Sequence, residues 1–339
     1  MSQSAAPISV IVAMDFSDAI LQELRAISPR LHIERHFPTV PERAWLDAEV
    51  LYTSRTFPTP EQAPRLRWIQ LHMAGVEDAL KSPVLKAQDI EVTNASGVHA
   101  VPMAEYCLMM MLAFNYQLPA MIAAKERIEW PARTETLYHP RPLRGQTLGI
   151  IGYGAVGREV ARLARQAGMT VLAAKRDVMH PEQTDKYLEP GTGDPDGEVP
   201  DRVYPMQAAV SLVRECDFVV LACPLTRLTR HLIDEEVLAA MKPTAVLINV
   251  ARGAVVDEAA LISALAAGRI AGAALDVFEE EPLPATSPLW NLPNVILSPH
   301  VSGNRDDYDQ QAANLFGENL RRYLEGDPLI NLVSREREY

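Results

Sequence analysis

The stretch 148–176, LGIIGYGAVGREVARLARQAGMTVLAAKR, decides the fold of this 339-residue chain. Its apolar run 148–151 is typical of a buried strand, and a Gly-x-Gly-x-x-Gly motif follows at 152–157. Helical spacing of apolar residues comes next, and a second apolar strand is expected at 169–174. Strand, glycine-rich turn, helix and strand form a βαβ unit, and in that setting the motif indicates dinucleotide binding.

Each glycine of the motif has its own physical reason. Gly152 permits a tight turn, Gly154 lets the backbone approach a pyrophosphate, and Gly157 lets the helix pack closely on the strand. The free N–H groups at the start of the helix then bind the phosphates. We therefore assign cofactor contacts to the whole turn, which consists of Gly152, Tyr153, Gly154, Ala155, Val156 and Gly157.

The end of the second strand indicates which dinucleotide is bound. An NAD-selective site usually has Asp or Glu there to accept hydrogen bonds from the ribose 2′-OH. This chain has Lys175 and Arg176, and its first acid, Asp177, comes after them. Because cations attract a 2′-phosphate, the sequence predicts NADP(H) as the preferred cofactor. The alternative is that both cations are solvated at the strand end and do not contact a phosphate, in which case NAD(H) is also accepted.

Composition is that of an ordinary two-domain enzyme and excludes several other classes. The length favours two domains, and the apolar and charged fractions of 48% and 22% are near globular averages. A net charge of -12 argues against nucleic acid or an anionic membrane surface as the main partner. Three cysteines without metal-ligand spacing predict no metal site and a reducing, cytoplasmic location, and the longest apolar stretch, 107–114, is too short to span a bilayer.

The domain organisation follows from the alternation of strands and helices along the chain. The N-terminal third forms its own α/β unit with a parallel sheet, and the helical pattern at 306–332 is expected to pack back on it. This predicts a discontinuous substrate-binding domain, 1–112 plus 304–339, and a dinucleotide-binding Rossmann domain, 113–303. The cleft between them would hold the chemistry.

Two segments have unusual composition. The apolar stretch 103–115 predicts a long buried helix that joins the domains or packs on a partner subunit. By contrast, residues 177–201 are dominated by Pro, Gly and acids, which predicts an exposed surface loop that is mobile or disordered.

Polar groups with catalytic potential follow four later apolar strands. They lie in the fragments CPLT (223–226), NVARGAVVDEAAL (249–261), ALDVFEEEPLP (274–284) and SPHVSGN (298–304). They include a guanidinium that can hold an anion, Arg252, and an imidazole that can transfer a proton near neutral pH, His300. A carboxylate such as Glu281 on the far ring nitrogen would favour the imidazolium and fix its orientation.

Together with the glycine motif, these fragments closely resemble the D-isomer-specific 2-hydroxyacid dehydrogenase family over nearly the whole chain. The resemblance implies an α/β protein of two Rossmann-like domains, each a parallel sheet flanked by helices, with the active-site cleft between them. It implies a homodimer formed through the dinucleotide-binding domain, and hydride transfer between NAD(P)H and a 2-keto acid. By motif, Arg252 would anchor the substrate, His300 would be the acid/base, and Glu281 would be its partner.

The resemblance extends to further contact residues. The substrate carboxylate would lie against backbone N–H groups of two loops, formed by Met73, Ala74, Gly75, Ser96 and Gly97. Asp276 would accept a hydrogen bond from the nicotinamide carboxamide. The remaining expected cofactor contacts are Cys223, Pro224, Thr226, Val250, Ala251, Arg252, His300 and Gly303. Ser96 and Glu77 depart from the Pro and Asp usual in the family.

The sequence therefore predicts an NADPH-preferring reductase of the glyoxylate/hydroxypyruvate reductase type, which converts a 2-keto acid to the D-2-hydroxy acid. Two alternatives remain open. An NAD-dependent phosphoglycerate dehydrogenase-like enzyme is disfavoured by Lys175, which replaces the expected acid. A dinucleotide-sensing corepressor-type binding protein would bind the cofactor tightly and turn over poorly with every keto acid.

Overall fold

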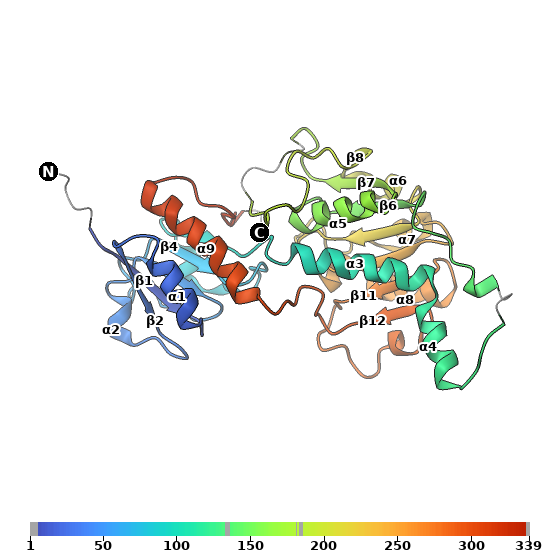
Figure 1. The fold of residues 1–339 in the computed structure, drawn as a ribbon, viewed down its shortest axis with the longest axis horizontal. Coiled ribbons are helices and arrows are strands. Elements are labelled where there is room, and N and C mark those ends of the chain that lie inside the picture. Colours follow the sequence, from blue (N-terminus) through green and yellow to red (C-terminus); the bar gives the residue numbers. More distant parts are fainter. Residues whose placement is uncertain (1–5, 133–135, 181, 183–185, 337–339) are drawn as a thin grey trace. The chain divides into compact units, whose positions relative to one another are not determined.

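The computed structural model describes residues 6–132, 136–180, 182 and 186–336, and the chain divides into two compact units. Unit 1 comprises residues 1–98, 185–187 and 305–339, and unit 2 comprises residues 99–184 and 188–304. The last helix, α9 (Tyr308–Glu325, red in Figure 1), therefore belongs to the unit that begins at the N-terminus. The first boundary between the units lies after Val98, whereas the sequence predicted it after residue 112, which is inside helix α3 (Ala100–Asn115).

Unit 1 is built on a five-stranded sheet in which all neighbouring strands are parallel. In spatial order the strands are β2 (Leu31–Arg35), β1 (Ile8–Ala13), β3 (Val50–Thr53), β4 (Trp68–Leu71) and β5 (Glu91–Thr93). Because the strands are parallel, their carboxyl ends meet at one edge of the sheet. The loop of Met73–Gly75 follows β4 at this edge, and Ser96 and Gly97 follow β5.

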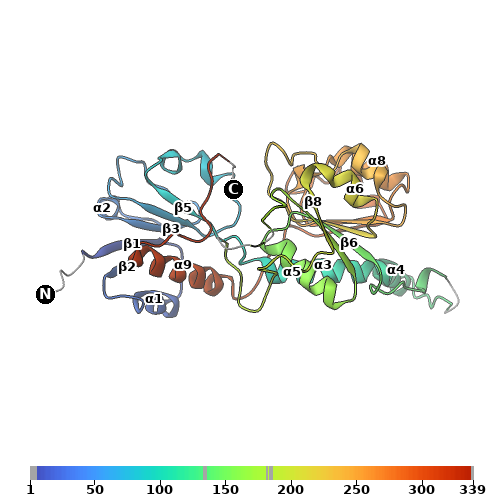
Figure 2. The same ribbon diagram turned by 90° about the horizontal axis from the view of Figure 1, so that it is seen from above.

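Helices cover both faces of this sheet, as its buried parallel strands require. Figure 2 shows α1 (Asp18–Arg25) and α9 on the same face, where Val10 and Phe316 belong to one buried cluster. On the other face, Ile11 packs in a cluster with α2 (Glu42–Trp45) and the short helices η1 (Ala79–Lys81) and η2 (Pro83–Lys86).

Unit 2 contains a seven-stranded sheet that is also parallel throughout. Its strands in spatial order are β12 (Val295–Leu297), β11 (Gly272–Leu275), β10 (Val246–Asn249), β9 (Phe218–Leu221), β6 (Thr147–Ile151), β7 (Thr170–Lys175) and β8 (Arg202–Pro205). The strand order reverses between β6 and β9. In open α/β sheets, ligands bind outside the carboxyl ends of the strands at such a reversal.

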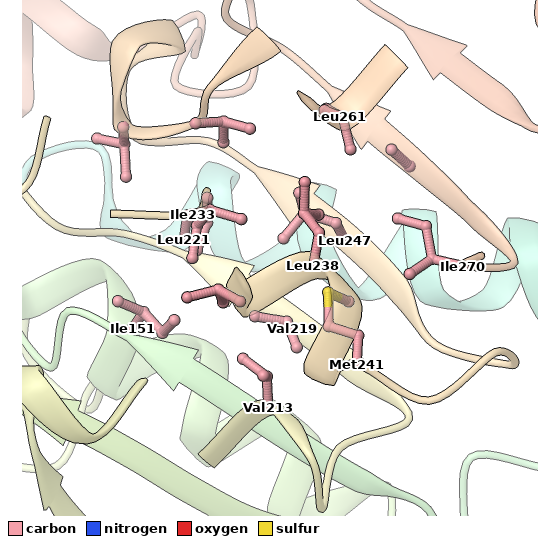
Figure 3. Close-up of a cluster of buried hydrophobic side chains, with 14 of the residues drawn as sticks. Ile151, Val213, Val219, Leu221, Ile233, Leu238, Met241, Leu247, Leu261 and Ile270 are labelled. Carbon is pink, nitrogen blue, oxygen red and sulfur yellow. The ribbon is translucent and has the colours of Figure 1, made fainter. Parts of the chain in front are cut away.

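The two faces of this sheet have separate cores. On one face, α3 and α5 (Ala155–Gln166) pack against apolar side chains of β6 and β7. On the other lie α6 (Ala209–Val213), α7 (Glu235–Ala240) and α8 (Glu258–Ala266). Figure 3 shows this second core, in which Val219 and Leu247 of the sheet face Leu238 and Leu261 of the helices.

The remaining elements are short. Helix α4 (Leu118–Glu126) follows α3, and the other elements are the 3₁₀ helices η3 (Thr136–Tyr138), η4 (Met206–Ala208), η5 (Gly253–Val255) and η6 (Pro288–Asn291). Within the described part of the chain, no single helix is long and apolar enough to cross a membrane. Helices α3 and α4 reach that length and apolar composition only together, and they are bent by 63° relative to each other.

The predicted α/β class with two parallel sheets flanked by helices is confirmed. The expectation of an exposed surface loop at 177–201 is wrong at Gly193 and Asp194, which are buried, whereas Pro190, Gly191 and Asp196 are exposed. At the two buried residues the segment 188–199 packs on α5. Residues 181 and 183–185 lie outside the described part of that loop.

Candidate active site

The glycine-rich turn between β6 and α5 has the shape that a pyrophosphate needs. Gly152 has a φ of +104°, and a Cβ there would lie 2.5 Å from the backbone nitrogen of Cys223. A Cβ on Gly157 would lie 2.2 Å from the carbonyl oxygen of Gly152, so both positions require glycine. In contrast, a Cβ on Gly154 would meet no described atom within 4 Å. Helix α5 begins directly after Gly154 without a side-chain cap, and N–H groups at the start of a helix are suited to bind a phosphate.

Two cations follow this turn at the end of β7, as the sequence predicted. Lys175 is half-buried and donates from Nζ to the carbonyl oxygen of His180 at 2.5 Å. Burial, together with the nearby charge of Arg158, lowers the pKa of Lys175. Arg176 is exposed. Strand β7 is the direct neighbour of β6, so these cations belong to the same edge of the sheet as the glycine-rich turn.

The turn after β10 carries Arg252 and is held by a buried asparagine. Asn249 accepts a hydrogen bond from the N–H of Ala251 at 3.0 Å and donates to the carbonyl of Arg252 at 3.1 Å. The guanidinium of Arg252 donates to the carbonyl of Ala251 at 2.7 Å. Val250 and Ala251 are buried, whereas Arg252 is half-buried. Sequence reasoning did not assign Asn249, although it begins the NVARG fragment.

His300 and Glu281 form the hydrogen-bonded pair that the motif order predicted. His300 Nδ1 lies 2.7 Å from Glu281 Oε2, and the imidazole side chain is 51% exposed. The other carboxylate oxygen of Glu281 accepts the N–H of Phe278 at 3.0 Å. A Cβ on Gly253 would lie 1.8 Å from the carbonyl carbon of Phe278, so the Arg252 turn packs directly on the segment that orients Glu281.

Asp276 is fully buried and holds the loop that carries His300. Its carboxylate accepts hydrogen bonds from Ser298 Oγ at 2.6 Å, Val301 N at 2.9 Å and Ser302 N at 2.9 Å. Its carbonyl oxygen accepts the N–H of His300 at 2.9 Å, where His300 has a φ of +55°. The structure thus gives Asp276 a positioning role that sequence reasoning missed, and a contact with the nicotinamide carboxamide stays a prediction.

A tyrosine from α3 extends this network. Tyr106 lies 2.7 Å from Ser298 Oγ, and burial raises the pKa of Tyr106 to about 12. Because the Ser298 hydroxyl donates to Asp276, the protonated Tyr106 hydroxyl donates to Ser298. The chain Tyr106, Ser298 and Asp276 therefore connects α3 to the His300 loop.

The loop after β9 is folded on itself. Thr229 Oγ1 donates to the carbonyl of Pro224 at 2.6 Å and accepts the N–H of Thr226 at 2.8 Å. Cys223 is buried, and that burial raises the pKa of its thiol to about 12. Gly303, another predicted cofactor contact, accepts a hydrogen bond from the Nδ1 of His99 at 2.9 Å.

In unit 1, two asparagines join the predicted substrate loops. Asn94 donates to the carbonyl of Ala74 at 2.8 Å and accepts the N–H of Ser96 at 3.1 Å, so the structure brings these two loops together. Asn331 donates to the carbonyl of Ser96 at 2.7 Å. Gly97 has a φ of +96°, which favours glycine. Neither asparagine was predicted, because the bonds that join the loops, Asn94 to Ala74 and Asn331 to Ser96, link residues that are 20 and 235 positions apart.

Groups of three or more metal-ligating side chains do not occur among the described residues. Besides the glycine-rich turn after β6, unit 2 offers a guanidinium, a carboxylate and an imidazole. These follow the carboxyl ends of the adjacent parallel strands β10, β11 and β12.

A family described as "D-isomer specific 2-hydroxyacid dehydrogenase, NAD binding domain" matches residues 108–302. The chain belongs to this family. A glyoxylate reductase of Aeropyrum pernix is 36% identical over 86% of this chain and 84% of its own length. A D-3-phosphoglycerate dehydrogenase of Methanocaldococcus jannaschii is 33% identical over 85% of this chain, but over only 52% of its own length.

Solved structures agree with this assignment. The D-isomer specific 2-hydroxyacid dehydrogenase of Xanthobacter autotrophicus, in complex with NADPH and MES, has a TM-score of 0.79 and 30% identity; the match covers 99% of this chain and 100% of that one. The NADPH-dependent glyoxylate/hydroxypyruvate reductase of Sinorhizobium meliloti, in complex with NADP and sulfate, has a TM-score of 0.75 and 25% identity over 98% and 100%. The chain is thus an NAD(P)-dependent oxidoreductase.

Proposed function

We propose that this chain is an NADPH-preferring reductase that converts a small 2-keto acid to the D-2-hydroxy acid, of the glyoxylate/hydroxypyruvate reductase type. The observation that carries the proposal is the 2.7 Å hydrogen bond between His300 and Glu281, beside the rigid turn of Arg252. A dehydrogenase that forms an alcohol needs a proton donor as well as a hydride, and this pair is suited to donate one.

The residues then have separate roles. Arg252 holds the substrate carboxylate and polarises the carbonyl through its planar guanidinium. Glu281 accepts a hydrogen bond from Nδ1, which fixes the ring of His300 and leaves Nε2 to face the reacting oxygen. The carbonyl carbon gains a hydride, and its oxygen gains the proton from Nε2. Asp276 keeps the His300 loop in place for this transfer.

The family resemblance adds two loops as contacts of the substrate carboxylate. We assign them to the backbone N–H groups of the loops of Met73, Ala74 and Gly75 and of Ser96 and Gly97, since such groups bind anions without a side-chain charge. The mutual connection of these loops through Asn94 supports the assignment.

The bound cofactor supplies the hydride. Its pyrophosphate would be held by the turn 152–157, and its 2′-phosphate by Lys175 and Arg176, which stand at the end of β7 where an NAD-selective site usually has Asp or Glu. The nicotinamide half would lie near the remaining predicted contacts, which are Cys223, Pro224, Thr226, Val250, Ala251, Asp276 and Gly303. Related structures solved with NADPH and with NADP support this preference.

We further propose a homodimer formed through the dinucleotide-binding unit. Apolar side chains of α3, α4 and the segment after them are exposed, which is unusual for a surface that remains in water. They are Met109, Leu112, Leu118, Met121, Ile122, Ile128 and Trp130. A second copy of the chain would cover them.

The test is oxidation of NADPH and NADH by the purified protein with glyoxylate, hydroxypyruvate, pyruvate, phenylpyruvate and a branched keto acid. We expect rapid NADPH oxidation with a small keto acid, slower NADH oxidation, and loss of both in Arg252→Ala. Tight cofactor binding without turnover on any of these acids would overturn the proposal and favour a dinucleotide sensor.

A further inference from the structure

The segment 188–199 is attached to α5, the helix that follows the glycine-rich turn. Gly193 donates its N–H to Glu159 Oε2 at 2.6 Å, and Glu159 is buried. Arg162 donates to the same carboxylate at 2.8 Å. Further along α5, Arg165 donates to the carbonyl oxygen of Val199 at 2.6 Å, so the segment is bound to the helix at two places.

The central residue of this segment is Asp194, whose buried carboxylate has three donors. Tyr153 donates its hydroxyl at 2.5 Å, and the N–H groups of Glu198 and Val199 donate at 3.0 and 3.1 Å. A buried carboxylate is stable only while such donors satisfy it. The bond to Tyr153 is therefore an energetically significant connection between the segment and the glycine-rich turn.

Tyr153 is held from a second side by Arg158. The guanidinium carbon of Arg158 lies 4.7 Å from the centroid of the Tyr153 ring, and Arg158 also donates to the carbonyl oxygen of Asp194. Burial and the neighbouring Asp194 raise the pKa of Tyr153, so its hydroxyl stays protonated and remains a donor. Ring and hydroxyl of this side chain are thus both fixed.

Tyr153 itself lies between Gly152 and Gly154 in the phosphate-binding turn. Those glycines supply the freedom that the turn needs, but they also allow it to move. We propose that the segment 188–199 positions the glycine-rich turn for the pyrophosphate of the cofactor, with Asp194 and Tyr153 as positioning residues. The proposal rests on the dinucleotide binding of the family and does not depend on NADPH preference.

Preorganisation is the physical basis of the expected effect. A turn already held in its binding geometry loses little conformational entropy when the ligand binds. Weakening the bond between Asp194 and Tyr153 would make that loss larger for every ligand with a pyrophosphate. Affinities for ADP, NAD⁺ and NADP⁺ should then fall by a common factor.

The experiment compares Tyr153→Phe and Asp194→Asn with the control Asp196→Asn, which removes an exposed carboxylate two residues away. Titration calorimetry gives Kd for ADP, NAD⁺ and NADP⁺, and amide hydrogen exchange reports on residues 153–157. We expect Kd to rise about three- to tenfold for all three ligands in both test variants, with faster exchange in the turn and no change in the control. In kinetics, KM for the cofactor should rise while kcat is retained.

Unchanged Kd values for ADP would overturn the proposal, even if the melting temperature falls, because that pattern indicates a purely structural bond. A loss confined to NADP⁺ would also overturn it, since the segment would then bind the 2′-phosphate. If wild-type protein binds NAD⁺ and NADP⁺ equally, the proposed cofactor preference fails while the common loss still supports the positioning role. Should Asp194→Asn not fold, Tyr153→Phe decides.

Discussion

Two histidines of unit 2 have nearly the same local structure, and the difference between them is their place in the fold. His300 and His231 both have positive φ, at +55° and +51°, and each ring lies within 2.8 Å of a glutamate, Glu281 or Glu279. Only His300 follows β12 at the sheet edge and is held by Asp276. A His–Glu pair therefore does not define a site by itself, and its loop and neighbours must be considered as well.

We expect His300→Ala to lower kcat by about 10²–10⁴-fold while Kd for NADPH stays near the wild-type value, because proton transfer is lost and the cofactor contacts remain. Stopped-flow kinetics and fluorescence titration measure both. His231→Ala is the matched control and should retain most of the rate. Full activity of His300→Ala would contradict the assignment.

The cations after β7 make a second prediction. Replacing Lys175 by Asp and Arg176 by Ala should shift the NADPH/NADH ratio of kcat/KM at least about tenfold toward NADH, since the new carboxylate repels a 2′-phosphate and accepts from a 2′-OH. Lys125→Asp combined with Arg127→Ala, at the exposed end of α4, is the control with the same change of net charge. An unaltered ratio would show that neither cation contacts the 2′-phosphate.

The cysteines should be inert in the folded protein. Burial raises the pKa of both Cys216 and Cys223 to about 12 and also raises that of Cys107. Reaction requires the thiolate, and below the raised pKa the protonated thiol dominates, so it dominates at pH 8. We expect mass spectrometry to find no iodoacetamide adducts at pH 8 until denaturant is added. Adducts on the native protein would contradict this burial.

At the scale of elements, the turn after β10 packs with its backbone against the segment that holds Glu281, the partner of His300. Gly253 lies against Phe278, whose N–H donates to Glu281. No side chain fits at Gly253 without moving that backbone.

Gly253→Ala should therefore lower both stability and kcat/KM. A new Cβ would lie 1.8 Å from the carbonyl carbon of Phe278, and the resulting displacement should cost about 1–3 kcal/mol of folding free energy. Thermal unfolding and steady-state kinetics on the keto acid measure the two effects. Wild-type values in both measurements would show that the packing is looser than we infer.

Most strands could be predicted from the sequence, because continuous apolar runs are typical of buried parallel strands. The exception is β8, whose residues Arg202–Pro205 are partly exposed and polar at one end, so no apolar run marks it. Sequence reasoning also failed for Gly193 and Asp194 in the segment 188–199. Its Pro, Gly and acidic composition predicts a solvated loop, and nothing local reveals that Asp194 is buried against Tyr153, 41 residues away.

The candidate site was predicted unevenly for the same reason. Arg252, Glu281 and His300 could be located because each belongs to a short motif after a strand. The residues that hold them, Asn249 and Asp276, act through hydrogen bonds that exist only once the strands are side by side. Motif order therefore identifies the reactive groups, whereas the groups that position them can be identified only once the fold is known.

At the scale of the whole molecule, the proposed dimer can be tested at the exposed apolar surface. Ile122 lies on α4 and is 50% exposed, so Ile122→Glu would place a charge inside the interface. We expect light scattering to give about twice the chain mass for wild type and the mass of one chain for the variant. Glu126→Gln on the same helix is the control. A dimeric Ile122→Glu protein would exclude this surface as the interface.

The return of the chain to unit 1 has a consequence for synthesis on the ribosome. Strand β1 begins at Ile8, but the cluster it belongs to is completed by Phe316 and Leu320 of α9. At about 5–20 residues per second, these side chains emerge roughly 15–60 seconds after β1. All of unit 2 is made in that interval, so the second unit in the sequence is the first that can finish folding. Until then, the face of the unit 1 sheet that α9 covers is protected only in part, by α1, which makes it a natural target for a chaperone during translation.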